Sequence, residues 1–439
     1  MTGIAAGLTG FGVLLALMAI RIPIAVAMLA TGIAGYGLVN GWMPLLAFLK
    51  TNTYYQFSTY SLSVIPLFVL MGEFATHAGM SRALYRAAAA FLGHLRGGLA
   101  MASIGGCAAF GAICGSSLAT AATMGQVALP EMRRYNYSGA LATGSLAAGG
   151  TLGILIPPSV ILVLYALMTE QSIAKMFVAA MVPGVIAALG YMLAVAVFVR
   201  RHPEAGPAGP RANWSHRLES LRETWSIILI FGVVIVGMYR GWFTPTEGAA
   251  VGAFGAFVLA VVKGGMRLRG LVQCLQGTAR TSGMIFLIML GAEMFNAFLS
   301  ATQTPTLASQ MIVQAGLSPL MVLAAILLLY LAMGCVMDSM SMLLLTIPIF
   351  YPILAGLDFG MGREETLIWF GILAVVVVEV GLITPPVGMN VFVINAMARD
   401  VPMWDSFRGV LPFLLSDLLR ILLLVAFPGI TLWLVRALS

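Results

Sequence analysis

Apolar stretches long enough to cross a lipid bilayer recur along the whole chain, and this pattern constrains the fold more than any other feature. A helix needs about 20 apolar residues to span ~30 Å of hydrocarbon. Charged residues make up only 9 % of the 439 residues, and the mean hydropathy is +1.00. Soluble domains carry roughly 25 % charged residues, so this chain must place its apolar surplus against lipid. We therefore expect an all-α integral membrane protein in contact with the bilayer.

Several other functions lack sequence support. The net charge of +7 comes from basic residues scattered between apolar stretches, which does not indicate nucleic-acid binding. The four cysteines show no metal-ligand spacing, and all four histidines lie in hydrophilic stretches. There is no HExxH motif and no nucleophile–base pair at membrane depth, so we expect no enzyme. A Gly-x-x-x-x-Gly-Lys-Ser/Thr motif is also absent, which argues against an ATP-driven pump.

The chain is duplicated. Four anchors recur in the same order and at nearly the same separation along the chain: Met71-Gly72 with Leu290-Gly291, Pro130 with Pro352, Pro157-Pro158 with Pro385-Pro386, and Pro183 with Pro412. Matching segments at nearly one separation predict two structural repeats.

Each repeat is predicted to contain scaffold helices, a short arm, a broken hairpin, a broken span and a final helix. The first repeat, 1–199, has scaffold helices at 4–74, an arm at 80–96, a hairpin at 98–131, a broken helix at 138–169 and a helix at 176–199. A hydrophilic linker follows at 200–224. The second repeat, 225–439, has scaffold helices at 225–300, an arm at 303–317, a hairpin at 319–357, a broken helix at 366–398 and a helix at 408–435.

The distribution of basic residues predicts the orientation. With the N-terminus outside, only five of the 23 Lys and Arg lie in outer segments and one, Arg420, lies within a span, which leaves 17 inside. Positive charge favours the cytoplasmic side. The linker is then cytoplasmic, the N-terminus and C-terminus are periplasmic, and the two repeats are inverted. The basic arm at 80–96 lies inside and the uncharged arm at 303–317 outside, as an inverted repeat predicts.

Two small-residue segments predict re-entrant hairpins. Gly115-Ser116-Ser117 is a poor helix interior, and backbone freed at membrane depth must find a partner or line a cavity. The alternative is a plain span with a small-residue packing face. The second repeat carries a corresponding tip in the segment 334–341, with Asp338 inside it.

The Pro-Pro pairs predict two broken helices. Pro157-Pro158 and Pro385-Pro386 each remove two amide donors inside an apolar stretch, which leaves carbonyls without intrahelical partners. Unwound carbonyls with nearby hydroxyls suit Na⁺, and a helix N-terminus beginning after the break suits a carboxylate. Packing alone explains one such break but hardly two at corresponding positions, so we favour a site for a substrate and an ion.

Four charged residues lie in apolar segments, where charges are costly and usually functional. Asp338, at a hairpin tip, is predicted to be a Na⁺ ligand or a local counter-charge. Glu379 either binds an ion or only braces the loop by hydrogen bonds. Asp417 and Arg420, spaced i and i+3, predict a structural ion pair or a contact to a partner subunit.

Five motifs resemble one transporter family. They are IPLFVLMG (65–72), GSSLATAATMG (115–125), LGILIPPS (152–159), FTPTEGAAVGA (243–253) and EVGLITPPVGMNVFVI (379–394). Together they resemble the large membrane subunit of tripartite ATP-independent periplasmic (TRAP) transporters, the DctM/SiaM type, across essentially the whole chain.

The resemblance implies an elevator fold like that of the divalent anion:Na⁺ symporters. It also implies a small four-helix membrane subunit (Q type), a periplasmic substrate-binding protein (P type), a location in the bacterial inner membrane and two or more Na⁺. The small subunit is expected to be a separate chain, because no four-span extension precedes the first repeat.

The resemblance further implies particular ligands. The first Na⁺ site is expected at Cys114, Ser117, Gly153, Ile156 and Pro158; Cys114 stands where a serine is expected, so it would act through its backbone carbonyl. By the repeat, the second is expected at Met337, Asp338, Met340, Gly381, Thr384 and Pro386. The substrate carboxylate is expected between the hairpin tips, near Ser116, Ser117, Ser339, Thr384 and Asn390.

The sequence thus predicts Na⁺-coupled import of a small organic anion, such as a C4-dicarboxylate or sialic acid, by an elevator mechanism. Two alternatives stay open: a symporter of the same superfamily that needs no binding protein, and an anion channel. The identity of the acid and the Na⁺ stoichiometry cannot be deduced from the residues.

Overall fold

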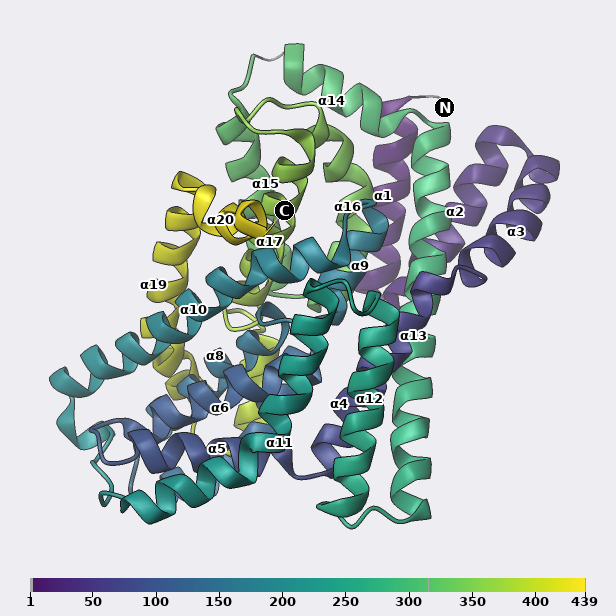
Figure 1. Cartoon of the computed structure of the whole chain (residues 1–439). Coiled ribbons are helices and arrows are strands. Elements are labelled where there is room, and N and C mark those ends of the chain that lie inside the picture. Colours follow the sequence, from purple (N-terminus) through teal and green to yellow (C-terminus); the bar gives the residue numbers. More distant parts are fainter. Residues whose placement is uncertain (1–2, 315, 439) are drawn as a thin grey trace.

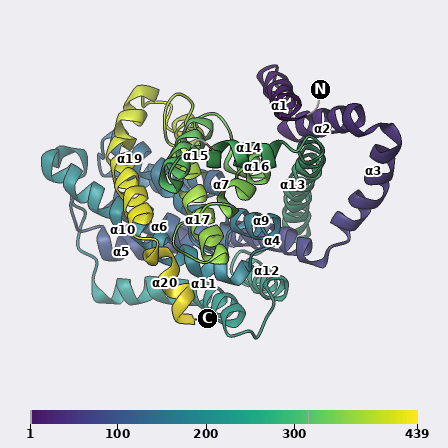
Figure 2. The same ribbon diagram turned by 90° about the horizontal axis from the view of Figure 1, so that it is seen from above.

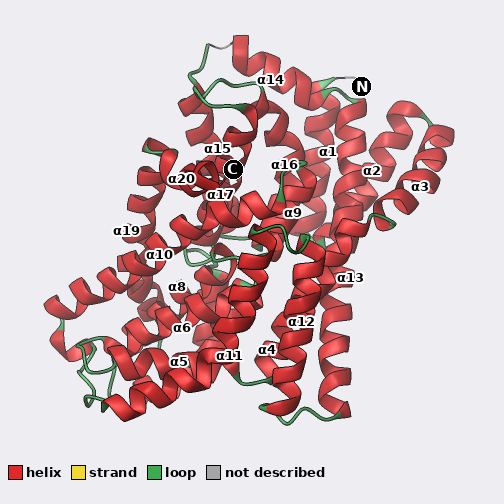
Figure 3. Cartoon of the chain, viewed as in Figure 1, coloured by secondary structure: helices red, strands yellow, loops and turns green. Residues whose placement is uncertain are grey.

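The computed structural model describes residues 3–314 and 316–438. Residues 1–2, 315 and 439, which the predicted first repeat, outer arm and second repeat include, lie outside the described residues. The described chain consists of helices and loops and contains no strand (Figure 3). The expectation of an all-α protein is confirmed.

The first half contains ten α-helices and one short 3₁₀ helix. They are α1 (Ile4–Ala19), α2 (Ile24–Asn40), α3 (Trp42–Phe57), η1 (Tyr60–Ser63), α4 (Val64–His77), α5 (Met80–Leu92), α6 (Gly98–Cys114), α7 (Ser117–Arg134), α8 (Gly139–Leu155), α9 (Val160–Met168) and α10 (Ile173–Arg201).

The second half follows a 3₁₀ turn, η2 (Pro203–Ala205). Its helices are α11 (Trp214–Tyr239), α12 (Pro245–Val262), α13 (Leu268–Ala301), α14 (Thr304–Gln314), α15 (Pro319–Gly334), α16 (Ser339–Ala355), α17 (Arg363–Gly381), α18 (Met389–Met397), α19 (Met403–Ala426) and α20 (Gly429–Leu438).

The helices include a set suited to crossing a bilayer. Among the described residues, five helices are long and apolar enough by themselves: α10, α11, α12, α13 and α19. Two bent pairs raise the number to as many as seven if each pair is one span: α3 with α4, bent by 57°, and α8 with α9, bent by 42°. The remaining apolar helices have at most 17 residues, because breaks divide the apolar stretches.

Helices from the two halves pack side by side. α2 lies along α13, α4 along α12, and α8 along α19 (Figure 1). Viewed from above, α1, α2, α3 and α13 form one side of the molecule, α10 and α19 lie on the opposite side, and α7 and α17 lie between (Figure 2). The arms α5 and α14 lie at opposite ends, with the N-terminus near α14 (Figure 1).

A pair of facing glycines joins each hairpin to its broken helix. In the first half, a Cβ on Gly111 of α6 would lie 2.4 Å from the Cα of Gly153 in α8. In the second half, a Cβ on Gly381 of α17 would lie 2.5 Å from the carbonyl carbon of Gly334 in α15. Only glycine permits such backbone contact, so both hairpins sit directly against the helices that carry the Pro-Pro pairs. Both Pro-Pro peptide bonds are cis.

The helices differ from the expected ones most at three places. α11 begins at Trp214 rather than at 225, since its polar first turns lie against the arm α5. Within the scaffold segment 4–74, the chain bends by 57° between α3 and α4. The last segment, 408–435, divides into α19 and α20 because Pro428 disfavours helical backbone at Phe427, which has φ −129° and ψ 76°.

Candidate functional site

The two hairpin tips are built alike. α6 ends at Cys114, Gly115 turns the chain with φ +64°, and the Ser116 Oγ caps α7 by accepting a hydrogen bond from Ala119 N at 3.4 Å. α15 ends at Gly334, and the Asp338 Oδ2 caps α16 by accepting from Ser341 N at 2.9 Å. Serine and aspartate are favoured helix N-caps.

The caps occupy equivalent positions in the two repeats. Ser116 and Asp338 are separated along the chain by the same distance as Pro130 and Pro352, which are one of the pairs that define the duplication. Asp338 therefore has a structural role as the N-cap of α16, in addition to the ion binding expected of it.

Both tips face one cavity of about 500 Å³. Its other walls come from α4, α13 and the segment around the α8–α9 break. It is lined by Val69, Gly72, Glu73, Thr76, Cys114, Gly115, Ser116, Ser117, Leu118, Ala119, Thr123, Ile154, Val160, Ile161, Thr281, Met284, Ile285, Asp338, Ser339, Met340 and Leu382. A cavity of this size suits a small organic molecule.

Glu379 connects the two tips. Its carboxylate is fully buried, and its Oε1 accepts a hydrogen bond from Ser339 Oγ at 2.6 Å while its Oε2 accepts one from Ser117 Oγ. The two hydroxyls belong to different hairpins, and the carboxylate lies on α17. A buried carboxylate needs such donors. The bracing role is thus present, and it joins both hairpins rather than one loop.

The cavity combines helix N-termini with negative side chains. The N–H groups of Ser117 and Leu118, and those of Ser339 and Met340, have no hydrogen-bond acceptor within the described part of the chain. Such free donors attract anions. Among the described lining residues, the charged ones are Glu73 and Asp338, and no lysine, arginine or histidine is present.

The residues expected for the first Na⁺ site lie close together. Cys114 ends α6, Ser117 starts α7, and Gly153 lies in the last turn of α8. Ile156 is the extended C-cap of α8, with φ −94° and ψ 121°. A Cβ on Gly115 would lie 3.5 Å from the Pro158 carbonyl oxygen, so the hairpin tip contacts the break.

An unexpected hydroxyl completes this group. The Thr120 Oγ1 is fully buried and has no oxygen or nitrogen partner among the described residues; the Cys114 thiol lies beside it. A Cβ on Gly153 would lie 2.5 Å from this Oγ1 and 2.9 Å from the Ser116 carbonyl oxygen. Pro157 and Pro158 cannot donate to the carbonyls of Gly153 and Ile154. The hydroxyl and carbonyl oxygens fit a small hard cation such as Na⁺.

Only some of the residues expected for the second Na⁺ site lie at the cavity. Asp338 and Met340 line the cavity, and Met337 precedes them at the tip. Gly381 packs on Gly334 behind the tip. Thr384 is half-buried, Pro386 is exposed, and neither lines the cavity.

Some of the residues expected to bind substrate line the cavity, and others do not. Ser116, Ser117 and Ser339 line the cavity. The Thr384 hydroxyl instead donates to the Val380 carbonyl at 2.6 Å. Asn390 is fully buried behind the cavity, where its Nδ2 donates to the Ala147 carbonyl at 3.2 Å and its Oδ1 has no partner within the described residues.

Sequence reasoning assigned neither Thr120 nor Glu73 to the site. Thr120 is four residues after Ser116 and so lies on the same face of α7, a spacing that could have identified it. The place of Glu73 on the cavity wall depends on how α4 packs, which no local pattern reveals.

A second buried polar group lies beside the site. The Asp417 Oδ1 accepts from Arg420 Nη2 at 2.7 Å, and its Oδ2 accepts from the Tyr191 hydroxyl at 2.8 Å. The Tyr191 hydroxyl also lies 3.1 Å from Thr151 Oγ1, on the helix that carries Gly153. Asp417 and Arg420 form a buried ion pair, and a hydrogen-bond chain connects it to α8.

The described residues contain no group of three or more His, Cys, Asp or Glu placed to hold a metal ion. A cation in the cavity would accordingly be held by hydroxyl, carbonyl and single carboxylate oxygens.

Comparison with known proteins identifies the relatives of this chain. Residues 11–430 match the family "Tripartite ATP-independent periplasmic transporter, DctM component". The C4-dicarboxylate TRAP transporter large permease protein DctM of Pseudomonas aeruginosa is 38 % identical over 374 residues, which cover 85 % of this chain and 86 % of the relative. The sialic acid TRAP transporter large permease protein SiaM of Vibrio cholerae is 30 % identical over 374 residues, which cover 85 % and 86 %.

A solved structure shares the fold. The YdaH transporter of Alcanivorax borkumensis, described as having an unusual topology, superposes with a TM-score of 0.62 over 89 % of each chain, at 14 % sequence identity.

Proposed function

Because this chain belongs to the DctM family of tripartite ATP-independent periplasmic transporters, we propose that it imports a small organic anion by Na⁺ symport. It would act as the large membrane subunit of a transporter with a small four-helix membrane subunit and a periplasmic binding protein. The substrate class follows the relatives, whose names give a C4-dicarboxylate and sialic acid. The membrane is the bacterial inner membrane, with both termini periplasmic and the central linker cytoplasmic.

One observation supports this proposal above the others: the tips of both hairpins and two helix N-termini meet at one cavity. The free N–H groups there, together with the hydroxyls of Ser116, Ser117 and Ser339, can bind a carboxylate. They do not distinguish one carboxylate from another, so we assign the choice of substrate to the binding protein.

The charges of the cavity support coupling to a cation. Glu73 and Asp338 would repel an incoming carboxylate, and no basic side chain among the described lining residues offsets them. An anion therefore binds favourably only after positive charge has entered. Na⁺ beside Thr120, Gly153 and the Ser116 carbonyl, with a second ion at the Asp338 tip, would supply it.

The Na⁺ gradient is large enough to drive accumulation. Each Na⁺ that moves inward across 100 mV contributes about 2.3 kcal/mol, and a tenfold concentration gradient adds about 1.4 kcal/mol. Two ions therefore supply roughly 7 kcal/mol, less the cost of moving the anion's own charge against the potential.

We propose that transport occurs by an elevator movement. The glycine contacts join each hairpin to its broken helix, and Glu379 joins the two hairpins to each other. These elements form a body that can move as one. The helices α2, α4, α12 and α13 would form the stationary scaffold.

Uptake into proteoliposomes tests the proposal. The chain is reconstituted with its small subunit and binding protein, an inward Na⁺ gradient is imposed, and labelled organic acids are followed. We expect uptake that requires Na⁺ and all three proteins. Asp338→Asn should reduce it at least roughly tenfold, whereas Asp358→Asn, a change at an exposed acid outside the cavity, should leave it unchanged.

The alternatives give different results. Na⁺-dependent uptake without the binding protein would identify a two-component or single symporter of the same superfamily. Flux that neither saturates nor depends on Na⁺ would identify an anion channel and exclude the symport mechanism.

A further inference from the structure

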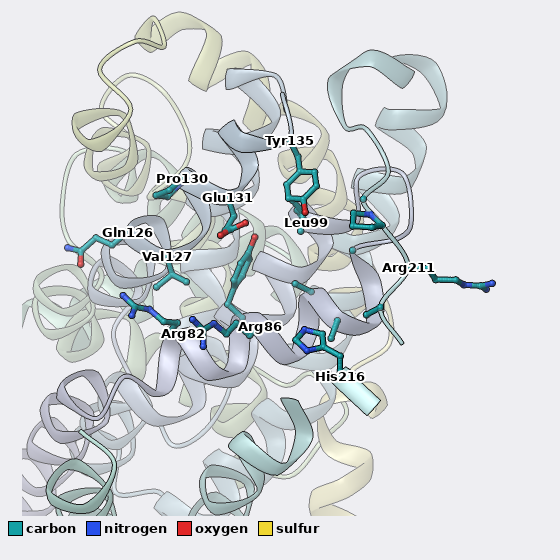
Figure 4. Close-up of a pocket in the computed structure, with 17 residues that line it drawn as sticks. Arg82, Arg86, Leu99, Gln126, Val127, Pro130, Glu131, Tyr135, Arg211 and His216 are labelled. Atoms are coloured by element: carbon teal, nitrogen blue, oxygen red, sulfur yellow. The ribbon is translucent and has the colours of Figure 1, made fainter. Parts of the chain in front are cut away.

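A second large cavity lies under the arm α5, beside the end of α7 that is opposite the first hairpin tip. Its volume is about 600 Å³, and α5, α7, the linker and the first turn of α11 enclose it. In Figure 4, Arg82 and Arg86 extend along one side of the cavity, Glu131 and Tyr135 lie across from them, and Arg211 is directed away.

The linker forms one wall because backbone hydrogen bonds fasten it to the arm. Gly209 N donates to the Gly93 carbonyl at 2.9 Å, and Gly97 N donates to the Gly206 carbonyl at 2.8 Å. Arg217 Nε also donates to the Ala90 carbonyl at 3.2 Å. Backbone hydrogen bonds therefore hold the linker wall of the cavity in place.

The cationic side of the cavity is unpaired. Arg82 and Arg86 occupy positions i and i+4 on one face of α5, and both side chains are exposed. Within the described part of the chain, neither guanidinium makes a hydrogen bond or an ion pair. Two adjacent guanidiniums provide the forked donors that phosphate oxygens accept.

Glu131 on α7 offers an acceptor, and Tyr85, on α5 with the two arginines, offers a buried hydroxyl. Glu131 lines the cavity and takes part in no ion pair within the described residues. The Tyr85 hydroxyl also lies on the wall, where the side chain is 3 % exposed and the oxygen has no partner among the described residues. Burial raises the pKa of Tyr85, so the phenol keeps its proton and can donate.

We propose that this cavity binds a phosphate ester that carries its own hydrogen-bond donor, such as the glycerol or ethanolamine phosphate of a phospholipid headgroup. Arg82 and Arg86 hold the phosphate. Glu131 accepts from the hydroxyl or ammonium group next to it, and the Tyr85 phenol donates to a remaining ester oxygen. A volume of about 600 Å³ accommodates a headgroup with its glycerol.

A merely solvated basic surface explains these features less well. Long arginines at a membrane surface need no cavity, and a solvated surface leaves no buried hydroxyl without a partner. The Glu131 carboxylate would also be unfavourable facing a bare anion, whereas it suits a ligand with a donor beside its phosphate. A bound headgroup would tie the arm and linker to α7, the second helix of the first hairpin.

Ligand titrations test the proposal and separate the two sources of such a phosphate. The purified, delipidated full-length chain is titrated with phosphatidylglycerol, phosphatidylethanolamine and phosphatidylcholine, and separately with sn-glycerol 3-phosphate and inorganic phosphate. Binding is read by native mass spectrometry and by the shift in Tm. Phosphatidylcholine is the matched lipid without an N–H or O–H donor.

The decisive variant is Arg82→Gln/Arg86→Gln. It should weaken binding of the donor-bearing headgroups roughly tenfold or more. The control Arg96→Gln/Arg134→Gln removes the same charge from exposed arginines that do not line the cavity and should leave binding unchanged. Glu131→Gln should remove the preference over phosphatidylcholine, and the Tm of each variant without ligand shows that it is folded.

Each outcome either supports the proposed ligand site or overturns it. Loss confined to the cavity variant supports the proposal, with a lipid source if only the phospholipids bind and a soluble source if glycerol phosphate binds equally well. Equal weakening in the control pair would reduce the effect to general surface charge and overturn the proposal. Equal binding of phosphatidylcholine to the unmodified chain would overturn the assigned role of Glu131 and with it the proposed ligand class.

Discussion

Ser117 and Ser339, at the tips of different hairpins, donate hydrogen bonds to the two oxygens of one carboxylate. That carboxylate, Glu379, has no exposed surface. The contact fixes the two tips relative to each other at the wall of the cavity.

Replacing Glu379 with alanine should abolish most transport and reduce stability. Two buried hydroxyls would lose their acceptor, at about 1–3 kcal/mol for each unsatisfied group. Glu379→Gln keeps one acceptor oxygen and the side-chain shape, and a serine hydroxyl can rotate to accept from the amide, so part of the stability should return. Melting temperatures and Na⁺-driven uptake measure the two effects. A Glu379→Ala protein with unaltered Tm would contradict the bracing role.

Thr120→Val should weaken Na⁺ binding without destabilising the fold. The hydroxyl has no oxygen or nitrogen partner in the described chain and has only the Cys114 thiol beside it, so its removal breaks no more than a weak contact to sulfur. Loss of one oxygen ligand should raise the Na⁺ concentration for half-maximal uptake by roughly tenfold. Thr123→Val, on the same helix and also on the cavity wall, is the matched control. Equal Na⁺ dependence in both variants would remove Thr120 from the ion site.

Gly153→Ala should impair transport because the new methyl group would occupy the space between Thr120 Oγ1 and the Ser116 carbonyl. The backbone would have to shift, which typically costs about 1–3 kcal/mol in a packed interior. Gly283→Ala in α13 adds a methyl where nothing lies within 4 Å and should be neutral. Uptake at saturating Na⁺ together with Tm distinguishes a blocked ion site from a general packing defect. Normal uptake in Gly153→Ala would show that no ion uses this space.

Removing one partner of the Asp417–Arg420 pair should destabilise the protein strongly, whereas replacing both residues with apolar ones should destabilise it little. Arg420→Met leaves Asp417 buried without its cation and should destabilise the protein by about 3–5 kcal/mol. The double variant Asp417→Leu/Arg420→Met should recover most of that loss, since it buries no unpaired charge. Thermal unfolding of the single and double variants forms a direct comparison. A double variant as unstable as Arg420→Met would mean that the pair has a role beyond mutual neutralisation.

Much of this architecture was predictable because its determinants are local. Gly115-Ser116 and the two Pro-Pro pairs interrupt helices through their own backbone chemistry, whatever surrounds them. Apolar length predicted membrane helices, and the resemblance predicted the family. The bend before α4 lies directly upstream of Pro66, whose ring disfavours a continuous helix through the preceding turn. This local signal was present in the sequence but was not used.

The site was harder to predict because it depends on how each helix is rotated about its axis. Thr384 and Asn390 were expected at the cavity along with the rest of their segment. The structure instead directs the Thr384 hydroxyl to its own helix and the Asn390 amide to Ala147. The contact between Ser117 and Glu379 joins positions 262 residues apart. No local spacing indicates a contact of that kind.

The bracing carboxylate also makes the two halves unequal. When the halves are aligned on their Pro-Pro pairs, Glu379 corresponds to Thr151, a neutral residue that faces Tyr191. An assembly of two copies of the first half would therefore bring serines together with no acid between them. At this position the first half can no longer rebuild the brace by pairing with itself, because it supplies a tip serine, Ser117, but no acid to accept a hydrogen bond from it.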